Sequence, residues 1–236
     1  MNEIELAKYL KDKYVDEFYE IYDTAPGLHF WPLEALILYG LIRETKPKMS
    51  FEMCCGEGRS TWVILHALLK NGNLEKFYTC DYHSQATRVE NYLKDHNLLT
   101  DKIKFIYGDI KQNIDQIPLE DLDFLFIDAD HTLPFGEWYC EQIIPKLKNN
   151  ILVAIHDINL SGDWNNRSPG TEANALINLH NDGKLSLEKI LWIEDWNINP
   201  DYKQSRQEIF SDFDAKYNKD LPNGATAFWY NRKLKQ

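Results

Sequence analysis

Two clusters of acidic and histidine side chains each follow a strongly apolar run. The first comprises Asp128, Asp130 and His131 after the run 121–127, and the second comprises His156, Asp157 and Asn159 after the run 150–155. Carboxylates and imidazoles beside a buried strand are costly unless water, a partner group or a metal ion compensates them. One such aspartate could cap a helix, but the repetition of the pattern after a second strand indicates a functional site.

These side chains offer two kinds of chemistry. His131 can take a proton near neutral pH, because the pKa of a histidine lies at about 6.5. The carboxylates of Asp128 and Asp157, with the amide oxygen of Asn159, suit a hard cation such as Mg²⁺. Such a cation would lower the pKa of a bound hydroxyl. His131 could instead only line the pocket. His156 could be a supporting core histidine or contact a substrate, so both alternatives stay open.

A glycine-containing turn lies earlier in the chain, where the run 49–54 gives way to a helical pattern. Gly56 and Gly58 there allow a tight turn and let backbone N–H groups approach a ligand. No third glycine opens the helix, so the G-x-G-x-x-G fingerprint of dinucleotide-binding proteins is absent. The turn therefore favours a ligand without a pyrophosphate. An ordinary strand–helix turn is the alternative.

Two further aspartates follow the next two β-prone runs. Asp81 stands where an acidic side chain can accept hydrogen bonds from both hydroxyls of a ribose, or can cap the following helix. Asp109 can accept from the exocyclic amino group of an adenine, or can likewise act as a cap. The order of glycine turn and acidic residues predicts an adenosine-bearing ligand.

The elements that must position these residues alternate along the chain. β-Prone runs at 49–54, 75–80, 102–107, 121–128 and 150–156 are separated by helical patterns near 59–70, 84–96, 110–117 and 135–147. This alternation predicts an α/β fold with a parallel sheet. Runs at 187–194 and 224–232, after a helix near 172–180, complete a Rossmann-like sheet of seven strands. The last strand is expected to be antiparallel at one edge. Ligands bind such sheets at the carboxyl ends of the strands.

The first 46 residues are expected to be a helical extension that caps the site. An amphipathic helix fills most of the first 22 residues, a breaker with Pro26, Gly27 and Pro32 follows, and a second helix covers 33–45. No glycine- or proline-rich linker divides the chain, so residues 1–236 are predicted to be one domain. The aromatic stripe of Tyr9, Tyr14 and Phe18 indicates core or homodimer packing.

Composition narrows the classes of partner. The 236 residues are 44% hydrophobic and 27% charged, with a net charge of −11. No cluster of Lys and Arg marks a nucleic-acid-binding face. Neither a signal peptide nor an apolar stretch of about 20 residues is present, so no membrane association is expected. The cysteines at 54, 55, 80 and 140 lack metal-site spacing and indicate free thiols, which is typical of the cytoplasm.

The ordered motifs resemble those of the class I methyltransferases that use S-adenosylmethionine (SAM). The resemblance runs from about Met49 to His156. It implies a SAM-binding first motif, a ribose-binding acidic residue and an adenine-side aspartate. The residues matched to these parts are Glu52, Gly56, Gly58 and Ser60, then Asp81 with the adjoining Tyr82, then Asp109, and finally Asp128 beside the cofactor.

The run D-A-D-H-T followed by H-D is most similar to small-molecule O-methyltransferases, both catechol-type and bacterial. Carried over by position, Asp128 and Asp157 match metal-binding aspartates, and His131 falls on the general base. This chain departs from the catechol-type pattern, because His131 replaces a lysine and Ile158 stands where an asparagine is expected. Asn159 follows one position late.

The resemblance implies an enzyme that methylates a hydroxyl of a small molecule such as a sugar or natural product. The acceptor contacts are expected from His29, His156, Trp164 and Arg167, the last two in a long loop after the fifth strand. Surface or packing roles are the alternatives for His29, Trp164 and Arg167. A nicotinamide-dependent oxidoreductase and a non-catalytic SAM-binding module remain as alternative functions.

Overall fold

A computed structural model describes residues 1–160, 171–217 and 225–232 of the chain. One seven-stranded sheet forms the centre, in the order β3-β2-β1-β4-β5-β7-β6. The strands are β1 (Met49–Met53), β2 (Lys76–Asp81), β3 (Ile103–Tyr107), β4 (Phe124–Ile127), β5 (Ile151–Ile155), β6 (Ser186–Trp192) and β7 (Ala227–Arg232). Neighbouring strands among β1 to β5 pair in parallel, whereas β7 runs antiparallel to both β5 and β6.

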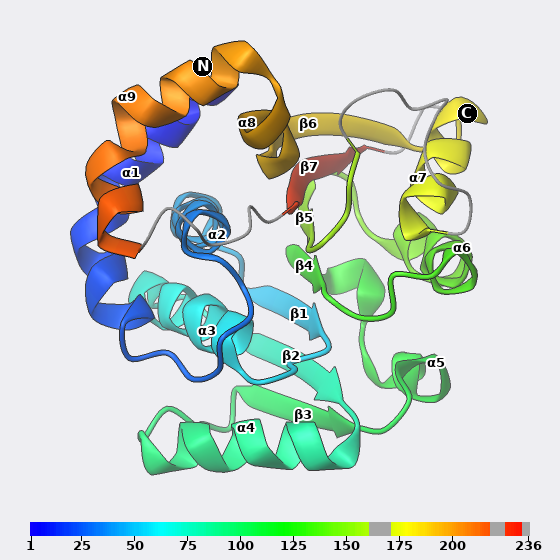
Figure 1. Ribbon diagram of the computed structural model, residues 1–236. Coiled ribbons are helices and arrows are strands. Elements are labelled where there is room, and N and C mark those ends of the chain that lie inside the picture. Colours follow the sequence, from blue (N-terminus) through cyan, green and yellow to red (C-terminus); the bar gives the residue numbers. More distant parts are fainter. Residues whose placement is uncertain (161–170, 218–224, 233–236) are drawn as a thin grey trace.

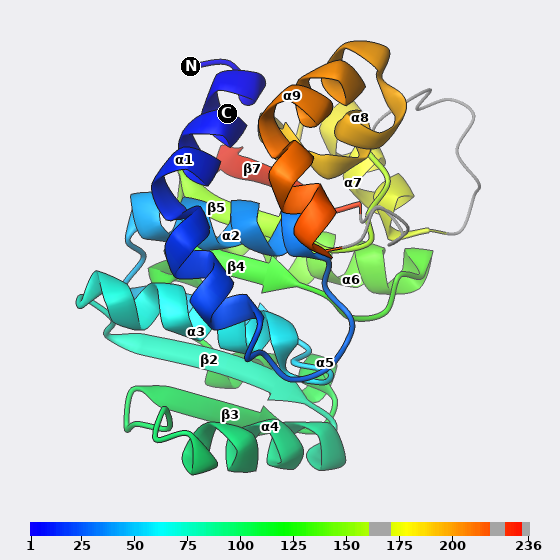
Figure 2. The same ribbon diagram turned by 60° about the vertical axis from the view of Figure 1, so that its left-hand side comes forward.

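Helices cover both faces of this sheet and give three layers (Figures 1 and 2). One face packs against α1 (Glu3–Tyr22), α2 (Pro32–Thr45), α3 (Arg59–Asn71), α4 (His83–Asp95), α8 (Ile193–Ile198) and α9 (Pro200–Tyr217). The other packs against α5 (Ile110–Asn113), α6 (Leu133–Gln142) and α7 (Glu172–Asn181). Short 3₁₀ turns η1 (Ile114–Gln116), η2 (Leu119–Asp121) and η3 (Ile144–Lys146) join them. Each face has its own apolar core.

The predicted α/β class and Rossmann-like sheet are confirmed, and the strands lie where the β-prone runs predicted them. The central strands are buried on both faces, which explains why they read as near-continuous apolar runs. Strands β1 to β4 pair in parallel, so their carboxyl ends lie at one edge of the sheet.

The expected place of the last strand was wrong. β7 is antiparallel as predicted, but it inserts between β5 and β6, and β6 is the edge strand. The inner position fits the burial of β7, where Phe228 and Trp229 are both fully enclosed by the two cores. The β6 side chains are only partly buried over most of the strand, as an edge allows.

Two of the elements that differ from the sequence prediction do so for local reasons. The helix expected over 135–147 ends as α6 at Gln142 and continues as a 3₁₀ turn, since Pro145 lacks an N–H group and cannot continue an α-helix. The long helix α9 was not predicted, because only Phe210 and Phe213 are buried on its apolar side. So sparse a stripe gives little helical periodicity.

The two N-terminal helices pack tightly on the sheet. A capping box at Asn2 and Glu5 begins α1. α1 lies on α2, and α2 lies on α3. The indole Nε1 of Trp62 in α3 donates to the carbonyl of Ile21, 3.0 Å away, at the end of α1. These helices therefore share one core with the sheet.

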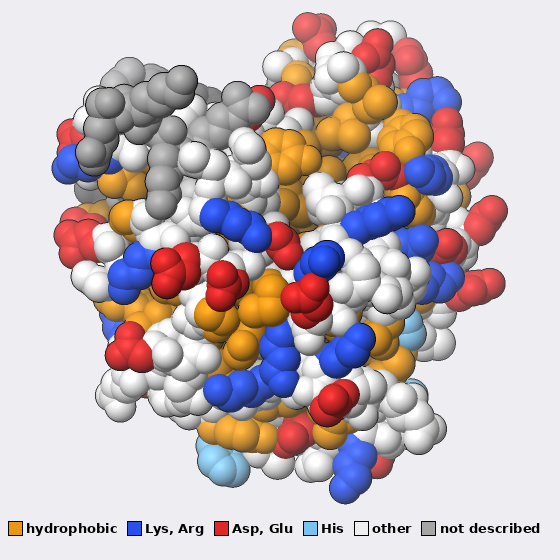
Figure 3. Space-filling view, turned by 180° about the vertical axis from the view of Figure 1, so that it is seen from behind, with side chains coloured by type: hydrophobic (Ala, Val, Ile, Leu, Met, Phe, Trp, Pro, Cys, Tyr) orange, Lys and Arg blue, Asp and Glu red, His pale blue; other side chains and the backbone are white. Residues whose placement is uncertain are grey.

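The surface shows charges of both signs. In the view from behind, Lys and Arg side chains alternate with Asp and Glu rather than gathering by sign (Figure 3). Over the part of the chain that the structure describes, no helix is both long enough and apolar enough to cross a membrane.

Candidate functional site

A cavity of about 420 Å³ opens at the carboxyl ends of β1 to β4. Its lining residues come from the loops after these strands and from the starts of α5 and α6, namely Cys54, Cys80, Asp81, Tyr82, Gly108, Asp109, Ile110, Lys111, Asp128, Ala129, Asp130 and Phe135. This volume lies in the range of small-molecule sites. The position is the edge where the sequence predicted a ligand.

Asp81 lines the cavity and is held by the glycine turn, whose Gly56 and Gly58 do not themselves line it. Gly56 and Gly58 both have positive φ angles, of 51° and 96°, and a Cβ on Gly58 would lie 3.1 Å from Val89. The backbone N–H of Gly56 donates to Asp81 Oδ2 over 2.8 Å, and that of Tyr82 donates to Oδ1 over 2.7 Å. Asp81 is thereby fixed at the cavity wall, beside the exposed ring of Tyr82.

Asp109 caps a helix and also lines the cavity. Its side chain accepts from the N–H of Lys111 over 2.9 Å and so caps the short helix α5. The residue also lines the cavity, together with Lys111. The Lys111 ammonium lies 5.2 Å from the ring centre of Phe135, within cation–π distance, and Phe135 lines the same cavity.

Glu52 and Ser60 lie behind the cavity and do not line it. Glu52 is fully buried in β1, where it accepts hydrogen bonds from the hydroxyls of Ser60, Thr61 and Thr79, each over 2.7 Å. Burial raises the pKa of Glu52 to about 7, although the three hydroxyls oppose the shift. In this structure the pair holds the start of α3 to β1.

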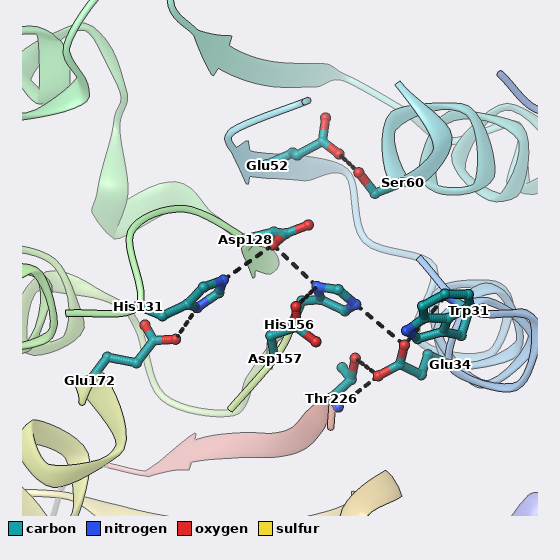
Figure 4. Close-up of polar contacts among 10 residues, drawn as sticks. All are labelled: Trp31, Glu34, Glu52, Ser60, Asp128, His131, His156, Asp157, Glu172 and Thr226. Carbon is teal, nitrogen blue, oxygen red and sulfur yellow. Dashed lines mark hydrogen bonds and ion pairs between the residues drawn. The ribbon is translucent and has the colours of Figure 1, made fainter. Parts of the chain in front are cut away.

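A chain of alternating carboxylates and imidazoles crosses the ends of β4 and β5 (Figure 4). Its centre is Asp128, whose Oδ1 lies 3.1 Å from Nδ1 of His156 and 3.9 Å from Nε2 of His131. The two clusters predicted from the sequence are therefore brought together. Asp128 lines the cavity, so the chain meets the cavity at this residue.

One end of the chain runs into the core through His156. Its side chain is only 4% exposed, and its Nε2 lies 3.3 Å from Oε2 of Glu34 on α2. Glu34 is itself fully buried and accepts from both the N–H and the hydroxyl of Thr226 at 2.8 and 2.6 Å. Burial alone would lower the pKa of His156, but the carboxylates of Glu34 and Asp128 raise it well above its usual value. His156 therefore resembles a buried supporting cation.

The other end of the chain is the pair of His131 and Glu172. Nδ1 of His131 lies 2.7 Å from Oε1 of Glu172, at the start of α7. The hydrogen bond to Glu172 is the main cause that raises the pKa of His131, against the opposing effect of burial. The His131 side chain is 40% exposed, whereas that of Glu172 is 3% exposed. The imidazole can thus be reached by a substrate while its carboxylate partner cannot.

The expected divalent cation is not supported by this geometry. Among the residues that the structure describes, no group of three or more His, Cys, Asp or Glu side chains could hold a metal ion. Asp128 faces two imidazoles, where a cation would have to sit. Asp157 has a positive φ of 51°, and its carboxylate lies 3.6 Å from Nδ1 of His156. Asn159 is exposed. Two imidazoles thus lie beside the carboxylate that the sequence predicted to bind Mg²⁺.

The predicted acceptor residues are only partly placed. His29 is exposed in the segment between α1 and α2, whereas its neighbour Phe30 is buried with its ring 5.3 Å from that of His156. Trp164 and Arg167 lie outside the described residues. Sequence reasoning missed Glu34 and Glu172, which come from helices far along the chain from the residues they contact. Both are acidic residues in the first turn of a helix, on the face of the helix that is buried. That position was the only feature of the sequence that could have pointed to them.

We compared the sequence and the fold of this chain with those of known proteins. Residues 52–158 match the sequence profile of a family described as a methyltransferase domain. This region includes the glycine turn, Asp81, Asp109, the first polar cluster, His156 and Asp157 of the second cluster, the last two residues of β1 and the whole of β2 to β5. No curated protein sequence matches the chain.

Solved structures with a similar fold include several methyltransferases. An O-methyltransferase of Bacillus cereus bound to SAH is 17% identical, with 80% of this chain and 90% of that chain covered and a TM-score of 0.56. The SAH-bound methyltransferase PaMTH1 of Podospora anserina is 15% identical, with 98% and 87% covered and a TM-score of 0.55. The O-methyltransferase TomG of Streptomyces achromogenes, in complex with SAM, is 14% identical, with 98% and 90% covered and a TM-score of 0.57.

These likenesses establish the fold. The chain has a Rossmann-like fold similar to that of SAM-dependent methyltransferases, and its residues 52–158 match a methyltransferase-domain profile, which agrees with the resemblance seen in its motifs. The fold does not select the acceptor, since a tRNA methyltransferase of Aquifex aeolicus has it too, with 14% identity, 93% and 76% covered and a TM-score of 0.53.

Proposed function

We propose that this protein is an enzyme that transfers the methyl group of SAM to a hydroxyl group of a small polar molecule, with His131 as general base. The observation that carries the proposal is the position of His131. Its imidazole is partly exposed, and its Nε2 lies on the side of Asp128, a residue that lines the cavity. A base must stand within reach of the reacting proton, and this one stands beside the expected cofactor site.

The cofactor part of the proposal rests on Asp81, which lines the cavity and is held by the glycine turn. An ionised Asp81 can accept from the two ribose hydroxyls of SAM, while Asp109 stands near the expected adenine. The turn lacks the third glycine of pyrophosphate-binding proteins, which supports SAM over a dinucleotide. Tyr82, exposed at the cavity, offers a ring face to the adenosine.

The reaction needs little from the protein beyond alignment and a base. The acceptor oxygen attacks the methyl carbon as the carbon–sulfur bond breaks, and the bonding electrons pass to the sulfur. The hydroxyl proton passes to Nε2 of His131. The products are a methyl ether and S-adenosylhomocysteine, and the proton then leaves His131 to solvent. Removal of the proton leaves negative charge on the acceptor oxygen and makes it a stronger nucleophile. A bound cation would otherwise favour the same loss of the proton.

The first experiment tests the cofactor. Titration calorimetry should show binding of SAM and of S-adenosylhomocysteine at micromolar or lower concentration. NAD⁺ serves as the competing ligand, since the alternative function as an oxidoreductase requires it. Heat with NAD⁺ and none with SAM would replace the proposal with that alternative.

The second experiment tests the reaction and the base. A panel of catechols, sugars and other small hydroxyl compounds is incubated with SAM, and the release of S-adenosylhomocysteine is measured. With a productive acceptor, His131→Ala should lower single-turnover rates by roughly 10²–10⁴-fold, which is the usual contribution of a positioned base. Affinity for SAM should stay unchanged. His180→Gln, an exposed histidine on α7, is the matched control. A loss below about tenfold would show that His131 only lines the pocket.

A further inference from the structure

We infer that Glu172 is the positioning residue for His131, and that it holds the imidazole in the tautomer whose free Nε2 can accept a proton. The inference rests on the proposed role of His131 and extends it to a residue that no sequence motif marks. Glu172 touches neither the cavity lining nor the expected substrate. It acts through the imidazole alone.

The contact between the two side chains is short and directional. Nδ1 of His131 and Oε1 of Glu172 are 2.7 Å apart, which is at the short end of hydrogen-bond distances and suits a charge-assisted bond. Nε2 of the same ring is 3.9 Å from Asp128, beyond hydrogen-bond range. Asp128 is nearer to His156, at 3.1 Å. The carboxylate of Glu172 is thus the one that orients the ring.

The fold fixes Glu172 through its backbone as well as its side chain. The N–H of Glu172 donates to the carbonyl of His131 over 3.1 Å, and Thr132 and Thr171 form an antiparallel bridge beside it. Helix α6 then packs closely on α7. Gly136 permits this approach, because a Cβ there would lie only 2.7 Å from Cα of Glu172. His131 and Glu172 are therefore held together at three points.

The chemistry follows from what an ionised carboxylate can do. It only accepts hydrogen bonds, so Nδ1 of a neutral His131 must carry the proton. Nε2 is then left with its lone pair, on the side of the ring nearer to Asp128, which lines the cavity. When the acceptor hydroxyl gives its proton to Nε2, the resulting imidazolium keeps Nδ1–H directed at a buried negative charge. The same logic assigns the orienting carboxylate in histidine-dependent hydrolases.

The test uses the full chain with Glu172→Gln. Glutamine has nearly the same shape, but its amide can donate or accept, so it no longer imposes one tautomer. Nitrogen chemical shifts of the His131 ring are recorded by NMR above its titration range. In the wild type we expect the proton on Nδ1. In Glu172→Gln we expect a mixture of tautomers and a fall in single-turnover rate of about 10²-fold, at the lower end for a base. SAM affinity should not change.

Glu137→Gln is the matched control, because Glu137 is an exposed residue of α6. It should leave both the tautomer and the rate as in the wild type. A proton on Nε2 in the neutral wild type overturns the inference without any variant, which keeps it testable if Glu172→Gln fails to fold. An unchanged tautomer in Glu172→Gln also overturns it. A changed tautomer with an unchanged rate leaves the positioning contact standing and refutes His131 as the base.

Discussion

The contact between α6 and α7 gives a prediction whose size can be worked from the structure. A Cβ added at Gly136 would meet Cα, Cβ and the carbonyl oxygen of Glu172 at 2.7, 2.9 and 3.0 Å. Two of these atoms belong to the backbone, so they cannot turn aside as the end of a flexible side chain can. Gly136→Ala must therefore push α7 away from α6 or remain strained.

Two opposing effects determine how much Gly136→Ala changes the free energy of unfolding. Overpacking of a core costs about 1–3 kcal/mol. Alanine inside a helix is more favourable than glycine by about 1 kcal/mol. Since the clash at Gly136 is with backbone, we take the upper part of the first range and expect a net loss of about 2 kcal/mol in the free energy of unfolding. For a chain of this size, that corresponds to a fall of about 4–8 °C in Tm.

Gly40→Ala in α2 is the matched control. Its Cβ would meet only the side chain of Leu10, at 3.0–3.3 Å. Leu10 can yield by a few tenths of an ångström, so the cost and the helix gain should nearly cancel. Urea denaturation followed by circular dichroism measures both variants. Equal stability of Gly136→Ala and Gly40→Ala would refute the reasoning, because it would mean that the α6–α7 approach is not constrained at Gly136.

Four other outcomes are expected. Asp81→Asn should weaken SAM binding at least tenfold in calorimetry, since a hydrogen bond to a charged group contributes about 1.5–3 kcal/mol; unchanged affinity would remove Asp81 from the cofactor site. Methyl transfer should persist in excess EDTA, because Asp128 faces imidazoles rather than a metal cage; full inhibition that added Mg²⁺ reverses would restore the cation. The rate should rise with pH through the raised pKa of His131, above 6.5, because only the neutral imidazole accepts a proton, and Glu172→Gln should move this limb to lower pH. Finally, the folded-state pKa of Glu52 is about 7 against 4.5 in the unfolded chain, so its contribution to stability is present below pH 4.5 and lost as pH rises to about 7. That loss, up to about 3 kcal/mol, should vanish in Glu52→Gln.

Most of the fold could be predicted from the sequence because the strands are short, apolar and regularly spaced. All seven β-prone runs became strands, since burial on both faces leaves a signal that needs no knowledge of tertiary contacts. The order of β6 and β7 could not be read in this way. Which strand lies at an edge depends on the path of the chain through α8 and α9, and α9 buries too few apolar residues to be recognised.

The residues of the site likewise fall into those that could be predicted from the sequence and those that could not. Residues at strand ends, such as Asp81, Asp128 and His131, could be predicted because the parallel sheet brings its carboxyl ends together. Glu34 and Glu172 could not, because each reaches the site from a helix more than 40 residues from its histidine partner. The metal prediction rests on contacts of the same kind. The carboxylates were visible in the sequence, but the two histidines that compensate Asp128 could not be assigned to it without the packing of β4 against β5.

Arg59, the first residue of the helix that follows the glycine turn, holds the segment between α1 and α2 by hydrogen bonds. Its guanidinium donates to the carbonyls of Pro26 and Gly27 and to the hydroxyl of Tyr22, and the carboxylate of Glu57 accepts from the N–H of Leu28. A local opening of the N-terminal helices therefore cannot leave the turn intact. Amides of α1 and of the turn should exchange with solvent in one cooperative opening, and a ligand held by the turn would slow proteolysis 30 residues upstream.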